Sequence, residues 1–253
     1  MKTVGEIYDA LDLYCDFKNQ EPWDNSGLLV GDREQKVNKI MVTLDITADV
    51  ISQAKEQGVQ LIVSHHPVIF KPLKALNPKD PAYMLAKFDI AAICAHTCLD
   101  AAKGGVNDVL ADILKLHDVK AVESDETSTL LLRVGYTDKE YTPDEFSKFV
   151  GEKLDTKVLM SSGENSINKV MLCTGSGGEF FKDAKAHGCQ ALVTGEAGYH
   201  HMIDSAYLGV TLIAAGHFET ENPIVDTLKK FFETNFPEIK TIKANRQRPV
   251  DII

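Results

Sequence analysis

A segment of this chain of 253 residues recurs later in the same chain without gaps. Residues 38–66 (NKIMVTLDITADVISQAKEQGVQLIVSHH) match residues 168–196 (NKVMLCTGSGGEFFKDAKAHGCQALVTGE), and the identical positions include Gly58 with Gly188 and Gln60 with Gln190. Each copy has the pattern of a strand, a helix closed by glycine and a second strand. The repeat predicts two related α/β halves. Alternatively, it is a chance likeness, because α/β units draw on a limited set of patterns.

A shorter pair of segments, residues 89–100 and 209–221, supports the repeat. Both are an apolar strand followed by histidine and, four positions later, an acid, so that His96 corresponds to His217 and Asp100 to Glu221. We expect an α/β fold whose mixed sheets are flanked by helices. The expected halves are residues 1–125 and 126–253, joined near residues 122–129, with the C-terminal strand able to pack back on the first half.

Hydrophobic periodicity and capping residues predict the individual elements. Helices are expected over residues 4–14, 48–56, 106–116, 143–154 and 224–233, with His117 and His187 at helix ends. Strands are expected at residues 28–30, 39–46, 59–66, 89–96, 126–136 and, as a final edge strand, 241–253. This alternation of strands and helices is typical of a layered α/β protein.

Composition excludes several classes of protein. The 27 Lys and Arg residues against 37 Asp and Glu residues give a net charge of −10, which argues against general binding of nucleic acids because phosphate backbones require a basic surface. No apolar run has the ~18 residues of a membrane span, and the acidic N-terminus is unlike a signal peptide. We expect a cytoplasmic protein whose cysteines are reduced and buried, namely Cys15, Cys94, Cys98, Cys173 and Cys189.

Imidazole and carboxylate side chains follow the apolar strands in four clusters. The clusters are His65-His66, His96-x-x-x-Asp100, Glu196 with His200-His201, and His217-x-x-x-Glu221. In open α/β sheets, binding sites lie outside the carboxyl ends of strands, so these positions suit a site that both halves share. The donor types favour Zn²⁺, Fe²⁺ or Mn²⁺ over Mg²⁺ or Ca²⁺. A histidine pair taken alone is more often an ordinary surface or core-edge feature.

The adjacent histidines also bear on the number of metals. Successive side chains of an extended strand diverge, so His65 and His66 more naturally bind two ions than one. A dinuclear centre activates water for hydrolysis.

Other motifs have competing explanations. Cys94-x-x-x-Cys98 lacks the spacing and the second cysteine pair of a zinc knuckle, so packing is the better explanation. The glycine-rich segment 174–178 precedes a helix and could hold an anion, but it lacks the end of a P-loop and could be a plain tight turn. Asp45 could support a metal ligand or be a simple loop acid.

Five segments carry a family resemblance. These are WDNSGLLVG (23–31), SHHPVIF (64–70), AHTCLDAAKGGVND (95–108), TGEAGYHH (194–201) and AAGHFETE (214–221). In their order and residue pattern they resemble the motifs of the dinuclear-metal proteins called GTP cyclohydrolase I type 2 homologues, or the Nif-three-like family. The resemblance extends over nearly the whole chain. The resemblance implies intertwined α/β halves and a toroidal homohexamer whose sites face an internal cavity. It also implies the short form of the family, without an inserted domain.

The resemblance further implies which residues bind the two metal ions. They are His65, His66, Asp100, His217 and Glu221, with Glu221 fitting the family spacing where Glu219 does not. Two positions depart from the family pattern: Cys98 stands where asparagine is frequent and Lys103 where proline is frequent. These departures affect the expected substrate contacts and leave the ligand set unchanged.

Two functions are compatible with these features. The first is a metal-dependent hydrolase in which a bridging water attacks a carbon or phosphorus atom of a small, nucleotide-like substrate. His96 and Glu196 are then the candidates for proton transfer, since they are polar strand-end residues outside the ligand set. The second is a metal-binding or metal-delivery protein, or an oligomeric scaffold, without turnover. A structural metal site is coordinatively closed, whereas a catalytic site keeps an open position.

Overall fold

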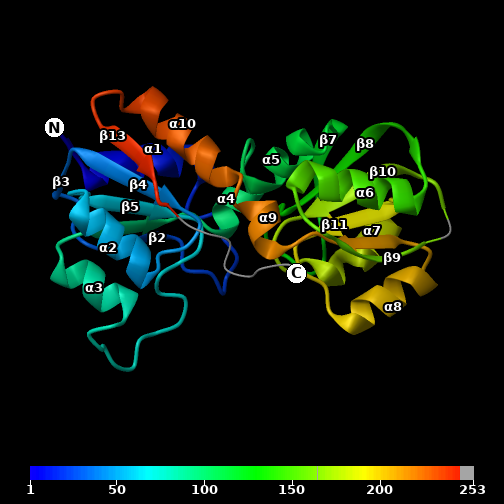
Figure 1. Ribbon diagram of the computed structural model, residues 1–253, viewed down its shortest axis with the longest axis horizontal. Coiled ribbons are helices and arrows are strands. Elements are labelled where there is room, and N and C mark those ends of the chain that lie inside the picture. The colour runs from blue at the N-terminus through cyan, green and yellow to red at the C-terminus, as the bar shows by residue number, and fades with distance from the viewer. Residues whose placement is uncertain (164, 246–253) are drawn as a thin grey trace. The chain divides into compact units, whose positions relative to one another are not determined.

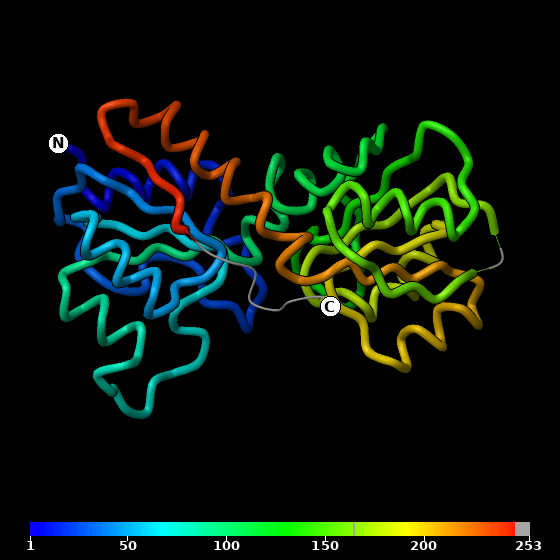
Figure 2. The backbone as a smooth tube through the Cα atoms, viewed as in Figure 1, coloured from blue at the N-terminus to red at the C-terminus, as the bar shows by residue number. Residues whose placement is uncertain are grey.

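The chain forms two compact α/β units. The computed structural model describes residues 1–163 and 165–245. Residues 1–102 and 224–245 make up the first unit, and Lys103–Pro223 the second. The first unit therefore contains both an N-terminal and a C-terminal segment, and the second unit is formed by the residues between them. Figure 2 shows this order by its colours. Residues 103–125, which we expected in the first half, group with the second unit.

The first unit is built on a mixed sheet. Its five strands, counted over the described residues, run in the order β13 (Lys240–Lys243), β4 (Lys39–Thr43), β5 (Leu61–Ser64), β6 (Ala91–Cys94) and β2 (Gly27–Val30). The strand β2 is antiparallel to β6, and the other pairs are parallel. A small antiparallel pair, β1 (Lys2–Thr3) with β3 (Lys36–Val37), lies outside this sheet. The register of Lys240 with Lys39 explains why the C-terminal segment belongs to this unit.

Helices cover both faces of this sheet (Figure 1). One face carries α2 (Ala48–Glu56) and α3 (Pro81–Lys87), and the other carries α1 (Val4–Cys15) and α10 (Ile224–Asn235). Met41 and Ile62 pack under α2 and α3. Because successive side chains of a strand point to opposite faces, the residues before and after each of them face the other helix layer. Thr3 and Glu6 form a capping box that starts α1.

The second unit has a six-stranded mixed sheet within its described part. The order is β7 (His117–Val122), β8 (Leu132–Tyr141), β10 (Ile167–Cys173), β11 (Ala191–Thr194), β12 (Thr211–Ala214) and β9 (Leu159–Ser161). The three strands β10, β11 and β12 are parallel, and the pairs at either side are antiparallel.

Two apolar layers enclose this second sheet. Phe146 and Val150 of α6 (Pro143–Leu154) and Leu110 of α5 (Val106–Ile113) pack against one face. Phe180 and Phe181, from the short helix η1 (Gly178–Phe180) and α7 (Phe181–Ala186), pack against the other. The helix α8 (Tyr199–Tyr207) contacts β12 and β9. The packing of α5 against β8 and β10 is the reason why residues after 102 belong here.

The sequence repeat is also a structural repeat. In the first unit, the side chain of Gln60 accepts hydrogen bonds from the backbone N–H groups of Asn38 and Lys39, both at 3.0 Å. In the second unit, Gln190 accepts from Asn168 and Lys169, at 3.2 and 2.8 Å. The glycines that end the two helices have φ angles of +63° at Gly58 and +69° at Gly188. Matching side-chain roles of this kind argue against a chance likeness.

The predicted α/β class with mixed sheets and flanking helices is confirmed. The helices at 48–56 and 143–154 have the predicted bounds, and the helices expected at 4–14, 106–116 and 224–233 differ by a few residues at one end. His117 was predicted at a helix end, which is wrong: α5 ends at Ile113 and His117 begins β7. Of the predicted final strand, Lys240–Lys243 is strand, and residues 246–253 lie outside the described residues.

A search of the described helices finds none long and apolar enough to span a membrane.

Candidate metal centre

Three histidines gather at one edge of the first unit's sheet. The strand β5 ends at Ser64 and delivers His65 and His66, while β6 ends at Cys94 and delivers His96. Because β5 and β6 are parallel neighbours, their carboxyl ends lie at the same edge. One ring nitrogen from each of these histidines lies within 4.8 Å of the others, a grouping that could hold a metal ion.

The backbone bends at His65 and His66, directly after β5. Ser64 Oγ donates a hydrogen bond to the carbonyl of His66 at 2.8 Å, and this contact supports the bend. The two ring centroids are 5.1 Å apart. The rings therefore do not diverge to opposite faces as they would on an extended strand.

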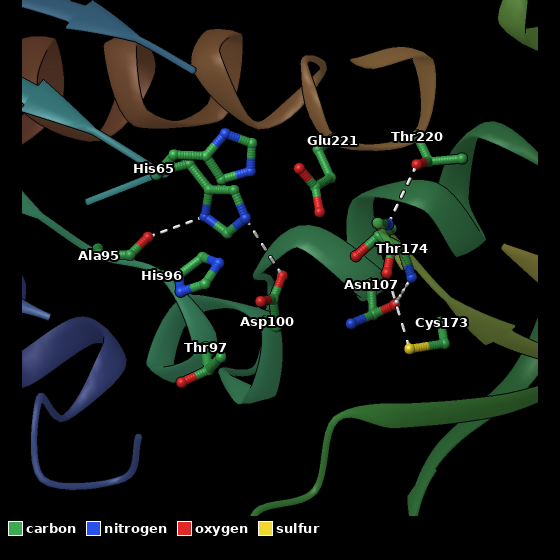
Figure 3. A network of polar contacts seen from close by, with 12 residues as sticks. His65, Ala95, His96, Thr97, Asp100, Asn107, Cys173, Thr174, Thr220 and Glu221 are labelled. Atoms are coloured by element: carbon green, nitrogen blue, oxygen red, sulfur yellow. Dashed lines mark hydrogen bonds and ion pairs between the residues drawn. The ribbon is translucent and has the colours of Figure 1, made fainter. Parts of the chain in front are cut away.

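His65 is completely buried, and its ring is fixed from two sides (Figure 3). Its Nδ1–H donates to the carbonyl oxygen of Ala95 at 2.9 Å. Its Nε2 lies 3.6 Å from Oδ1 of Asp100, on the short helix α4 (Thr97–Ala101). With the proton on Nδ1, the lone pair of Nε2 faces the same region as the carboxylate of Asp100.

His66 has a carboxylate partner. Its Nδ1 lies 2.7 Å from Oδ1 of Asp45, which follows the end of β4. Of the two alternatives for Asp45, the structure supports the one in which it orients a candidate ligand. A histidine that donates one N–H to a carboxylate keeps its other nitrogen available for a metal.

His96 has the same kind of partner in Asp24. The Nδ1 of His96 lies 2.7 Å from Oδ1 of Asp24. The other carboxylate oxygen of Asp24 accepts from the backbone N–H and the hydroxyl of Thr97, at 3.0 and 2.6 Å, and from the Ser26 hydroxyl at 3.0 Å. Burial disfavours the charge of Asp24, but His96 and these donors outweigh burial and hold the pKa of Asp24 well below its usual range. Asp24 is therefore a buried carboxylate.

The second unit carries its own histidine and carboxylate pair. His217 and Glu221 lie on the short helix α9 (His217–Glu221), which follows β12. Nε2 of His217 and Oε2 of Glu221 are 3.0 Å apart, and the Glu221 side chain is only 5% exposed. Glu219 instead turns back toward Gly216 at the start of the helix. Glu221, which the sequence resemblance favoured over Glu219, is therefore also the acid that lies beside His217 in the structure.

Glu196 lies at the opposite side of the His217 ring. Its Oε2 is 3.4 Å from Nδ1 of His217 and accepts a hydrogen bond from the hydroxyl of Ser176 at 2.5 Å. The Ser176 hydrogen bond, followed by that of His217, lowers the pKa of Glu196 despite its partial burial. His217 thus has a carboxylate at each ring nitrogen.

A closely packed glycine turn supports this pair. Gly175 has a φ of +65°, and a side chain there would run into Oε1 of Glu221. Its backbone N–H donates to the hydroxyl of Thr220, and that of Gly177 donates to Thr194, at 3.3 and 2.9 Å. The buried Asn107 accepts from the Thr174 N–H at 2.8 Å (Figure 3). Three N–H groups of this segment are thus used internally, which favours the tight turn over an anion site.

Other sequence clusters do not join these groups among the described residues. His200 is exposed on α8, and Nδ1 of His201 accepts from the N–H of Gly198 at 3.4 Å. The five cysteines are buried, as predicted, and none of them forms a disulfide within the described part of the chain. The thiol of Cys94 donates to the carbonyl of His65 at 2.9 Å, and that of Cys98 lies 3.8 Å from the Cys15 sulfur. His187 caps α7 as predicted, with Nε2 donating to the carbonyl of Glu123.

Sequence reasoning missed the role of Asp24. The segment that contains it reads as a turn before a strand, and its partner His96 is 72 positions away. Nothing local indicates that pairing. Ser176, the partner of Glu196, was missed for the same reason, because it reads as part of a glycine-rich turn.

Comparison with known proteins assigns the chain to a family. Residues 2–249 match the family model described as Duf34/NIF3 (NGG1p interacting factor 3). The chain belongs to the Duf34/NIF3 family. A Clostridium perfringens relative called GTP cyclohydrolase 1 type 2 homolog is 36% identical over 88% of each chain. A Helicobacter pylori relative, from strain J99, called GTP cyclohydrolase 1 type 2 is 31% identical over the full length of both.

Solved structures agree with the Duf34/NIF3 assignment. A hypothetical protein of Staphylococcus aureus has a TM-score of 0.88 and 25% identity, covering 99% of both chains. The reduced form of HcgD from Methanocaldococcus jannaschii has a TM-score of 0.84 and 25% identity, covering 96% of this chain and 98% of HcgD. The recognised family resemblance is therefore confirmed.

The donor chemistry of this Duf34/NIF3 chain fits divalent metal ions. In the first unit, the Nδ1 atoms of His65, His66 and His96 are each held by an oxygen acceptor, and the three rings together could hold an ion. In the second unit, an imidazole nitrogen and a buried carboxylate oxygen lie side by side in His217 and Glu221. Mixed nitrogen and oxygen donors suit Zn²⁺, Fe²⁺ and Mn²⁺.

Proposed function

We propose that this chain is a dinuclear-metal-dependent hydrolase that acts on a small, nucleotide-like substrate. The proposed ligands of the two metal ions are His65, His66, Asp100, His217 and Glu221. The observation that carries the proposal is the shared orientation of His65 and His66, each with Nδ1 held by an oxygen acceptor. Metal-binding histidines almost always donate their other ring N–H to an oxygen acceptor in this way.

Two of the proposed ligands are held in place by other parts of the chain. His65 is buried and tied to a backbone carbonyl, and Glu221 is buried under a glycine turn that admits no side chain. Fixed ligands lose little conformational entropy when an ion binds. Divalent ions bound there would lower the pKa of a water molecule, which is the chemistry that hydrolysis at neutral pH requires. We propose Zn²⁺, Fe²⁺ or Mn²⁺ as the ions.

We assign proton transfer to His96 and Glu196. Asp24 orients the ring of His96 and, as a permanent carboxylate, stabilises the imidazolium form that follows proton uptake. Glu196 is exposed at 58% of its side chain, and the Ser176 hydroxyl orients it. Its lowered pKa keeps it ionised, so that it is a carboxylate when a proton is transferred. These two residues lie outside the proposed ligand set.

The nucleotide-like substrate is supported by the names of the relatives. GTP cyclohydrolase 1 type 2 is the printed name of the Helicobacter pylori relative, which aligns over its full length. Hydrolytic opening of a purine ring would use an activated water and a proton donor, which the proposed centre supplies. The net charge of −10 means that an anionic substrate must be attracted by the metals and local donors and not by the protein as a whole.

The first test of this proposal is the metal content of Asp100→Ala. The purified variant should lose most of its bound Zn²⁺, Fe²⁺ or Mn²⁺ while its circular dichroism spectrum stays unchanged. The matched control is Asp112→Ala, which removes an exposed carboxylate from α5 and should leave the metal content unchanged. Equal metal content in the two variants would contradict the ligand assignment.

Turnover separates the hydrolase from a metal-delivery protein or scaffold. The metal-loaded protein is to be screened against nucleotides, phosphoesters and cyclic amides, with His96→Ala as the comparison. Hydrolysis that His96→Ala abolishes without loss of metal supports the proposal. Absence of turnover across the screen, combined with rapid transfer of metal to an acceptor, would establish the alternative.

We further propose a toroidal homohexamer that works in the cytoplasm. The helix α8 has an exposed apolar stripe, since Tyr199, Ile203 and Tyr207 recur every fourth residue and are 76, 48 and 90% exposed. Exposed apolar patches of this kind are typical of protein interfaces. The five free cysteines are compatible with a reducing compartment. Light scattering of the wild type and of Tyr207→Asp would test the assembly.

A further inference from the structure

Two large aromatic side chains next to His96 remain exposed in the first unit. Trp23 is 58% exposed and Phe70 is 45% exposed. Their ring centroids are 5.9 Å apart, and each ring lies edge-on to His96, at 6.1 and 6.2 Å. Exposed aromatic rings cost solvation free energy that burial would recover. Such rings beside a candidate centre therefore point to a bound partner.

The segments that carry these rings are firmly held. Trp23 directly precedes Asp24, whose side chain is fully buried and bound to His96 and Thr97. Asn25 ties the two segments together, because its side-chain amide donates to the carbonyl of Ile69, the residue before Phe70, at 2.5 Å. The rings are thus presented on anchored backbone. A pre-organised aromatic surface binds with little loss of conformational entropy.

The chemistry of the three rings indicates the class of ligand. Aromatic faces stack well on flat, electron-poor heterocycles, and such stacking tolerates different bases. His96 donates its Nδ1–H to Asp24, which leaves Nε2 to accept a hydrogen bond from an N–H at the edge of such a ring. An aliphatic or purely sugar-like ligand lacks the flat π-face on which such rings stack.

We propose that Trp23, Phe70 and His96 form the binding surface for a planar nitrogen heterocycle, the base portion of the substrate. This inference rests on the proposed function for the identity of the site. It does not depend on the metals for binding, because stacking requires only the rings. The competing occupant is a second copy of this chain packed over the same two side chains.

The single tryptophan of the chain makes the test direct. Since Trp23 is the only source of indole emission, its fluorescence reports on this surface alone. Guanosine, adenosine and cytidine are the probes, because nucleosides lack the phosphates that metals would bind. Ribose 5-phosphate is the non-planar control. We expect saturable quenching by the nucleosides and none by ribose 5-phosphate, both with metal bound and after treatment with a chelator.

Variants of Phe70 identify the stacking partner. Phe70→Leu keeps an apolar side chain of similar size and removes the ring, so the dissociation constant of guanosine should rise ~10-fold. Phe70→Tyr should restore binding. Tyr207→Leu, a change at an exposed aromatic residue of the other unit, should have no effect. Calorimetry of Trp23→Leu, which has no indole emission, should show a comparable loss.

The outcomes distinguish this inference from the proposed function. Quenching that persists in the chelated protein and weakens in Phe70→Leu supports the aromatic surface, whether or not the metal assignment holds. Normal metal content with no quenching by any nucleoside overturns it and leaves the metal centre intact. Emission that changes with protein concentration and not with nucleoside also overturns it, in favour of a second copy of the chain.

Discussion

Asp45 and His66 form a carboxylate and imidazole pair in which Oδ1 and Nδ1 are 2.7 Å apart. The two residues come from the ends of neighbouring parallel strands, β4 and β5. The carboxylate fixes the proton on Nδ1 and raises the basicity of the opposite nitrogen. It acts on the ring without being one of the proposed ligands, so its effect can be tested separately from theirs.

Asp45→Asn should weaken metal binding without abolishing it. An amide can still accept from the Nδ1–H of His66, but it lacks the charge that makes the imidazole more basic. Loss of such a partner typically costs ~10–100-fold in metal affinity. Calorimetric titration of the chelator-treated protein with Zn²⁺ would measure the change. The control is Glu56→Gln, an exposed residue of α2; an unchanged affinity in Asp45→Asn would exclude this role.

Asp24→Asn should destabilise the protein. The buried carboxylate accepts from His96, Thr97 and Ser26, and an amide nitrogen at one of the oxygen positions would face these donors. We expect the free energy of unfolding to fall by about 2–3 kcal/mol. Urea denaturation measures this quantity, with Asp49→Asn on the surface of α2 as the control. A loss no larger than that of the control would show that the network contributes little.

Gly175→Ala and Gly188→Ala separate backbone strain from a steric clash. Both glycines have positive φ angles, +65° and +69°, so alanine costs ~1–2 kcal/mol at either position. A side chain at Gly188 meets nothing within 4 Å, whereas one at Gly175 collides with the Glu221 carboxylate. Gly175→Ala should therefore lose additional stability, measured by thermal unfolding, and also metal content. If the two variants behave alike, Glu221 is free to move and the turn does not fix it.

Glu145→Gln should change how stability depends on pH. Glu145 accepts from the backbone N–H of Thr142 and then from its hydroxyl, both at 2.9 Å, and these bonds lower its pKa below the ordinary value of 4.5. Because the folded pKa is below the unfolded one, the stabilisation is present above the ordinary pKa and is lost as the pH falls through the folded value.

The expected difference between the wild type and Glu145→Gln is therefore largest near neutral pH. It should shrink as the pH falls below the ordinary pKa of 4.5 and through the lower folded value. Urea midpoints over this range test the prediction. Ser124→Ala, in the loop after β7, serves as a control that titrates nothing. A difference that grows on acidification would mean that Glu145 does not stabilise α6 through its charge.

Much of the fold could be predicted because its signals are local. Thr47 before α2 and Thr142 before α6 accept from backbone N–H groups in the first turn, and both helices begin where these caps predict. The repeat could be detected in the sequence because residues with the same structural role are identical in the two units. Gln60 and Gln190, for example, accept equivalent backbone hydrogen bonds. The strand at His117 was missed because its pairing with Tyr136 is not a local property.

The candidate site was predicted to a lesser extent. The ligand candidates are visible in the sequence because they follow buried strands, where side chains reach the edge of a sheet. The hydrogen-bond partners of these residues cannot be recognised in the sequence, because Asp24 and Asp45 lie 72 and 21 positions from the histidines that they orient. Whether an acid in a loop is solvated or orients an imidazole is decided by tertiary contacts.

The pairing of β13 with β4 has a consequence for the order of events during synthesis. The strand that completes the first sheet is the last described element to leave the ribosome, whereas the described part of the second unit is one continuous stretch of chain. The nascent first unit therefore exposes an open sheet edge at β4 while the second unit is already complete. Open edges can pair with other chains, so in this interval the growing polypeptide is exposed to mispairing at β4.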